Sequence, residues 1–166
     1  MASIAGDDRA ADTIPIALVA TVLVIAIMTG LAAFGLTNAA PAVQMAAVDR
    51  QVGVMANDCR LLLSMAPRNL DDPCSPQGAF RLIALDLPDG LEYLSFGYDP
   101  DSGGGHRGTI YYAVCGTKKA LIVDESAVFR TAGSGRTMPG PGRYELCIEY
   151  ARDAPGHRYL LVSAAA

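Results

Sequence analysis

The sequence is poor in the residues that nucleic-acid and metal sites need. It has 13 lysine and arginine residues against 17 aspartate and glutamate residues, and no basic run is long enough to follow a phosphate backbone. Two histidines are too few for a histidine-rich metal site, and the four cysteines form no Cys-x-x-Cys pair. We therefore expect no nucleic-acid partner, no metal and no cofactor.

Charged side chains are also missing from a long segment near the N-terminus. No charged residue lies between Thr13 and Val48, and residues 14–36 are dominated by Ile, Leu, Val, Ala and Met. A helix needs about 20 predominantly apolar residues to cross a bilayer, and this segment is long enough. We predict a polar leader over residues 1–12 and a transmembrane helix over residues 13–40, with membrane lipid as its partner.

A cleaved secretory signal is one alternative interpretation of this segment. Such a signal begins with basic residues and has an apolar core of only about 7 to 15 residues. Here the leader carries three aspartates against the single basic residue Arg9, and the apolar core is longer, although small residues at 37–40 would suit a cleavage site. We predict a retained single-pass anchor with a cytoplasmic N-terminus, because the leader is short and all the cysteines follow the helix.

One face of the apolar helix carries small side chains at helical spacing. They are Ala26, Gly30, Ala33 and Thr37. Small residues let two membrane helices approach closely, so this face predicts self-association. The alternative is that alanine and glycine are simply frequent in membrane helices and in this composition.

Beyond Pro41 the apolar residues become one-sided. Those that fall on one helical face are Val48, Val52, Met55, Cys59, Leu62 and Leu63. Charged residues lie largely on the opposite face, which is the pattern of an amphipathic helix. We predict this helix over residues 41–66, and we expect its apolar face to pack on a domain.

From Phe80 onward apolar residues recur at every second position, and turn residues recur at short intervals. The predicted strands are 80–85, 91–96, 109–115, 120–123, 127–130, 143–150 and 158–162, with one of the turns at 116–118. Seven short strands without an intervening helix favour an antiparallel sheet or a small β-sandwich over residues 67–166. The fold class predicted for the whole chain is therefore α+β, with a long N-terminal helix.

All four cysteines follow the apolar segment, where disulfides would form if this part of the chain were exported. Cys147 lies on the wetter face of its strand, which favours a bonded half-cystine, and Cys115 ends another predicted strand. We predict a Cys115–Cys147 bridge, and a Cys59–Cys74 bridge whose loop closure would contribute about 3 kcal/mol. The other pairings, and four reduced thiols, are the open alternatives.

Two glycine-rich loops carry fragments of ligand-binding motifs. Residues 133–137 precede two prolines that forbid the helix a phosphate loop opens, so we predict a surface loop there. Asp99, Asp101 and His106 begin like a calcium loop, but Ile110 stands where the closing glutamate belongs. We predict a hairpin loop, no catalytic residue and no enzymatic activity.

The order of these segments resembles that of archaeal type IV pilin-like proteins. A short leader ends in Arg9-Ala10 and is followed at once by a long apolar helix, an amphipathic helix and a β-rich domain. The resemblance implies that a dedicated peptidase cuts before Ala11, leaving the apolar helix as the mature N-terminus. Pro15 stands where many pilins carry a glutamate that helps assembly, so an accessory subunit fits better than a major filament protein.

We therefore expect a structural protein of the cell surface. Its helix would anchor the chain and associate with other copies or other pilin-like subunits, and its β-rich domain would face outward. The alternative is a single-pass membrane protein that does not assemble, whose β-rich domain binds an envelope or extracellular partner. Processing before Ala11 and contacts through the small-residue face distinguish the two.

Overall fold

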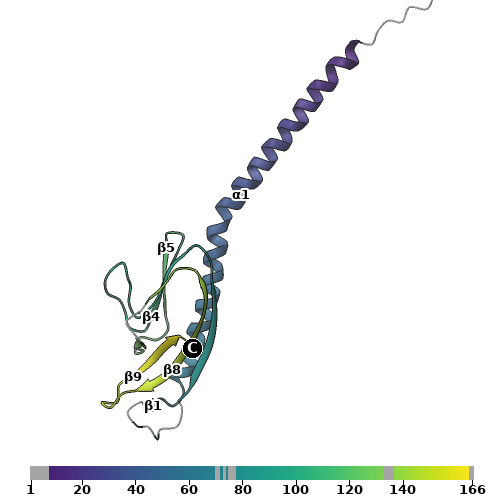
Figure 1. The fold of residues 1–166 in the computed structure, drawn as a ribbon. Coiled ribbons are helices and arrows are strands. Elements are labelled where there is room, and N and C mark those ends of the chain that lie inside the picture. The colour runs from purple at the N-terminus through teal and green to yellow at the C-terminus, as the bar shows by residue number, and fades with distance from the viewer. Residues whose placement is uncertain (1–7, 70–71, 73, 75–77, 133–136, 165–166) are drawn as a thin grey trace, which may run out of the picture. The chain divides into compact units, whose positions relative to one another are not determined.

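The computed structural model describes residues 8–69, 72, 74, 78–132 and 137–164, with backbone alone for residues 8–15 and 139. One long helix, α1 (Asp8–Leu63), is followed in the described residues by nine strands (Figure 1). This arrangement confirms the α+β fold class. The chain divides into two compact units, residues 1–40 and 41–166, and α1 contributes to both. We call the second unit the β domain.

The strands of the β domain form two sheets (Figure 1). The five-stranded sheet has the order β1 (Arg68–Asn69), β8 (Gly142–Arg152), β9 (Arg158–Ala164), β6 (Phe129–Thr131), and β2 (Phe80–Leu87) also pairs with β8. The four-stranded sheet has the order β5 (Thr117–Ile122), β4 (Thr109–Val114), β3 (Leu91–Phe96), β7 (Thr137–Pro139).

Antiparallel pairing dominates both sheets, as predicted, but two short pairings are parallel. They join β1 to β8 and β6 to β9. The seven predicted strands are all present with shifted ends, except that β3 has the predicted bounds. β1 and β7 were not predicted, and the predicted strand end at Cys115 is instead part of a turn.

That turn joins β4 to β5 through Cys115 and Gly116, one residue earlier than predicted. Both residues have positive φ, 49° and 76°, and Val114 pairs with Thr117 on either side of them. A two-residue connection with two positive φ values is the tight hairpin whose twist matches that of the strands. Gly116 adopts this conformation at little cost, whereas Cys115 is held in it by the pairing of the two strands.

The amphipathic part of α1 supplies one wall of the hydrophobic core. Its predicted stripe is buried at every position but the last: Val48, Val52, Met55, Cys59 and Leu62 are at most 1% exposed, and Leu63 is half-buried. Facing side chains come from both sheets and include Leu85, Leu94, Ile110, Leu146, Ile148 and Leu160. The apolar face of the helix therefore holds the two sheets together through a shared core.

A helix side chain also satisfies the open edge of β2. The Gln51 amide accepts a hydrogen bond from Asp86 N–H at 2.8 Å and donates one to Asp86 C=O at 2.7 Å. These are the bonds that a neighbouring strand would make to Asp86. Gln51 therefore closes one end of an edge that would otherwise leave unpaired main-chain groups.

Replacing Gln51 by alanine should lower the free energy of unfolding by about 1 to 2 kcal/mol, because both hydrogen bonds are lost and two main-chain groups lose their partner. Urea unfolding of the chain in detergent, followed by the near-ultraviolet circular dichroism of its tyrosines, measures this. Arg50→Ala, one residue earlier and exposed, is the control and should change stability by less than about 0.5 kcal/mol. Equal effects of the two substitutions would contradict the role of the amide.

Candidate functional site

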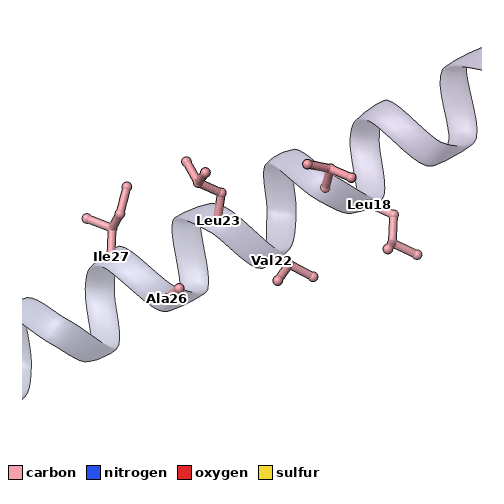
Figure 2. A pocket seen from close by; sticks show the side chains of 6 residues that line it. Leu18, Val22, Leu23, Ala26 and Ile27 are labelled. Carbon is pink, nitrogen blue, oxygen red and sulfur yellow. The ribbon is translucent and has the colours of Figure 1, made fainter.

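The apolar segment, residues 16–40 of α1, has no protein partner within the described chain. Every side chain in it is exposed, and the large apolar ones range from 52% exposed at Ile27 to 73% at Leu36. Figure 2 shows Leu18, Val22, Leu23, Ala26 and Ile27 extending from the bare helix, where they line a shallow apolar hollow. A single helix cannot enclose a ligand, so this surface suits lipid or another helix.

By length and composition, α1 is able to cross a membrane. Its most apolar 18-residue window has a mean hydropathy of 2.6, and none of that window is buried in protein. The core helix of a soluble domain would be buried, whereas this segment exposes a far larger apolar surface than soluble proteins leave open. The structure is therefore compatible with the predicted membrane helix.

The threonine side chains of the apolar segment are satisfied within the helix itself. Thr21 and Thr29 each donate a hydroxyl hydrogen bond to the carbonyl four residues earlier, at 2.8 Å. Thr37 donates to the carbonyls of Ala33 and Phe34, at 3.2 and 2.9 Å. Polar groups in hydrocarbon need such internal partners, so these threonines are suited to lipid.

The small-residue face lies on this exposed segment. Ala26, Gly30, Ala33 and Thr37 are all exposed, and a Cβ atom added at Gly30 would meet nothing within 4 Å. The face is therefore smooth and uncovered in the single chain. Its use in helix association stays a prediction.

The predicted processing site lies at the start of the helix. Arg9, Ala10 and Ala11 belong to the first turn of α1, and their side chains lie outside the described part of the chain. Cleavage before Ala11 therefore stays a prediction as well.

All four cysteines are free thiols in the structure, so neither predicted disulfide is present. Cys115 lies in the β4–β5 turn of one sheet, whereas Cys147 lies in β8 of the other. Cys74 is exposed, and Cys59 is fully buried in the core, where burial raises the pKa of its thiol to about 12. Cys59 therefore behaves as a small core residue with an unreactive thiol.

The loop that begins like a calcium site is tied to strands β3 and β5 through Asp101. The Asp101 carboxylate accepts a hydrogen bond from Tyr93 at 2.7 Å and pairs with Lys118 at 2.8 Å. These partners, Lys118 first, lower the pKa of Asp101, which stays ionised. In the described part of the chain no group of three or more His, Cys, Asp and Glu side chains is arranged to hold a metal ion.

The other glycine-rich loop was predicted over residues 133–137. Residues 133–136 lie outside the described residues, and Thr137 begins β7.

A polar cluster that sequence reasoning missed joins α1 to the four-stranded sheet. Tyr112 donates a hydrogen bond to the Asp49 carboxylate at 2.8 Å, and Lys119 pairs with its other oxygen. Partial burial raises the pKa of Asp49, but the bonds from Lys119 and Tyr112 outweigh it and hold this pKa below its ordinary value of 3.8. The cluster therefore favours the folded state while Asp49 is ionised.

Replacing Asp49 by asparagine should lower the free energy of unfolding at neutral pH by about 0.5 to 1 kcal/mol, since the pair is partly exposed. Because the pKa of Asp49 is lower in the folded state, its contribution is present above the unfolded value and is lost as pH falls through the folded pKa. The difference between the two proteins should thus shrink below about pH 4. Urea unfolding at several pH values checks this, with Asp89→Asn in an exposed turn as the control. A difference that stays constant down to acid pH would contradict the assignment.

Two features therefore stand out: an exposed apolar helix segment, and a β domain built on the same helix. No known protein family, curated protein or solved structure matches this chain.

Proposed function

We propose that this chain is a pilin-like cell-surface subunit, anchored by the apolar segment, with its β domain outside the membrane. One observation carries the proposal: α1 is uninterrupted from Asp8 to Leu63, exposing apolar side chains in its first part and forming a core wall in its second. The same helix therefore carries both the exposed apolar segment and one wall of the domain core. This is the organisation that the resemblance to archaeal type IV pilin-like proteins implies.

The small-residue face supports assembly through the same helix. Ala26, Gly30 and Ala33 would let a second helix approach closely, and the Thr37 hydroxyl already has partners within its own helix. Before assembly the segment lies in lipid, and after assembly it lies against the helices of neighbouring subunits. Its apolar side chains avoid water in both states.

The rival proposal is a single-pass membrane protein that does not assemble. Pro15 supports it, because many pilins carry at this position a glutamate that helps assembly. In that case the β domain would bind an envelope or extracellular partner, and the small residues would serve lipid packing only.

Intact-mass and N-terminal analysis of the protein from its native membranes tests the processing step. A mature N-terminus at Ala11 is expected for a pilin-like subunit, whereas an intact Met1 or Ala2 would sink that pathway and leave the non-assembling anchor. A start within residues 39–43 would instead mean a cleaved secretory signal and a secreted, unanchored domain. Repeating the mass measurement with and without reduction and alkylation also counts any disulfides formed in the native compartment.

Cysteine crosslinking in membranes tests the assembly step. With the four native cysteines replaced by alanine or serine, Gly30→Cys should form a disulfide-linked dimer on oxidation. Met28→Cys, which lies on the opposite side of the helix, is the matched control and should stay monomeric. Equal crosslinking of the two variants would indicate random collision in the bilayer, and no crosslinking at Gly30→Cys or Ala33→Cys would favour the rival.

A further inference from the structure

One edge of β2 is open over most of its length. Among the described strands β2 pairs with β8 alone, and the Gln51 amide bonds both main-chain groups of Asp86 on the other edge. In an antiparallel pair, alternate residues direct their main-chain groups to opposite edges. The N–H and C=O groups of Phe80, Leu82 and Ala84 therefore point away from β8, as those of Asp86 do. Within the described chain no other strand lies against them.

The side chains along this open edge are apolar and exposed. Phe80 is 48% exposed and Leu82 is 60% exposed. Both lie on the face away from the core, because Ile83 between them is buried in it. Natural sheet edges are usually protected from further pairing by charged residues, and the edge strand β5 has Lys118 and Lys119. The outer face of β2 carries no charge before its closed end, so its open edge is suited to another strand.

A hollow lies beside the closed end of this edge. It has a volume of about 470 Å³, and its lining includes Ala84, Asp86, Arg143 and Glu145. Ala84 pairs with Glu145 and Asp86 with Arg143, so the four side chains share the outer face of the sheet. A large apolar side chain on a strand that pairs opposite Ala84 would lie beside this hollow.

We propose that the open edge of β2 binds β2 of a second copy of this chain, antiparallel and about a two-fold axis at Leu82. In this register Leu82 lies opposite the same residue of the second copy, and Phe80 lies opposite Ala84, where its ring fills the hollow. Each opposed pair exchanges both of its main-chain hydrogen bonds. Because Gln51 already bonds Asp86, this is the register that uses every open residue of the edge. The strand is thus complementary to itself, as a two-fold interface requires.

The direction of α1 shows what kind of pair this is. Gln51 contacts Asp86, and further along the helix Asp58 pairs with Arg81 at 3.9 Å, so α1 and β2 run in opposite directions within the β domain. In the two-fold pair the helix parts of the two copies, residues 41–63, also run in opposite directions. Such a pair suits copies that meet from two facing surfaces. It therefore goes beyond the proposed function, in which α1 serves neighbours within one membrane, and does not depend on it.

Sedimentation of the full chain in density-matched detergent tests this pairing. We expect a concentration-dependent dimer. Leu82→Lys and Leu82→Glu, each alone, should weaken it by at least about tenfold, because like charges then lie opposite each other. Mixed in equal amounts, the two variants should dimerise again, because a lysine of one copy then lies opposite a glutamate of the other. Ile122→Lys is the matched control, at an exposed apolar position of the edge strand β5, and should dimerise like the unchanged chain.

Four outcomes would overturn the proposal. A chain that stays monomeric at every concentration has no such interface. A monomer whose amide signals at residues 80–84 shift with a capped Thr-Val-Thr-Val-Thr peptide would assign the edge to a different protein. A dimer that Gly30→Ile dissolves and Leu82→Lys leaves intact would mean that the copies meet through the apolar segment. If the Leu82→Lys and Leu82→Glu variants stay monomeric when mixed, although near-ultraviolet circular dichroism shows both folded, the two-fold register is wrong.

Discussion

Replacing Met55 by alanine is expected to destabilise the β domain by about 2 to 5 kcal/mol. Met55 is completely buried on α1 and belongs to the core that both sheets share with the helix. Truncation removes apolar contact area and leaves a cavity that surrounding strands can fill only in part. A loss of this size is a large fraction of the stability of a small domain.

Val54→Ala is the matched control for this prediction. Val54 precedes Met55 on the same helix, but its side chain is 56% exposed. Its truncation removes little buried area and should change the free energy of unfolding by less than about 0.5 kcal/mol. Urea unfolding in detergent, followed by tyrosine circular dichroism, compares the two. If Met55→Ala cost no more than Val54→Ala, the amphipathic part of α1 would not be part of the core.

The parts of the fold that could be predicted from the sequence are those in which apolar residues recur at a constant spacing. The stripe from Val48 to Leu62 repeats at helical spacing over four turns, and apolar and polar residues alternate over residues 143–150, so both elements were found. β1 and β7 have only two and three residues, which is too short for any period to appear. The parallel pairs of β1 and β6 depend on which strands become neighbours, and local patterns carry no such information.

The candidate sites also divide into those visible as a local sequence pattern and those formed by residues far apart in the chain. The apolar segment and its small-residue face were visible because neighbouring residues share one property. The Asp49–Tyr112 bond joins residues 63 positions apart, so no local pattern shows it. The alternation of β8 correctly placed Cys147 away from the core, but it could not say which side chain lies beside it. The disulfide prediction therefore had no geometric basis.

Placing two aspartates in the apolar segment should prevent it from anchoring the chain in a membrane. Leu23→Asp and Ile27→Asp lie one helical turn apart, near the middle of the apolar segment. Each exchange of an apolar for a charged residue at a membrane-helix centre costs about 3 to 4 kcal/mol on insertion scales, so the pair costs about 6 to 8 kcal/mol. The double variant should move from the membrane pellet to the soluble or aggregated fraction after alkaline extraction.

The control places two aspartates on α1 within the β domain. Ala46→Asp and Arg50→Asp change two exposed positions of the same helix, and this variant should stay in the membrane pellet. Because this control adds two aspartates and also removes an arginine, its net charge falls further than that of the Leu23 and Ile27 variant, so its retention in the pellet would show that the position of the charges along α1 matters and not net acidity. If the Leu23 and Ile27 double variant also stayed in the pellet, lipid could not be the partner of the apolar segment. Its exposed side chains would then have to be covered by another protein, and the anchoring step of the proposed function would fall.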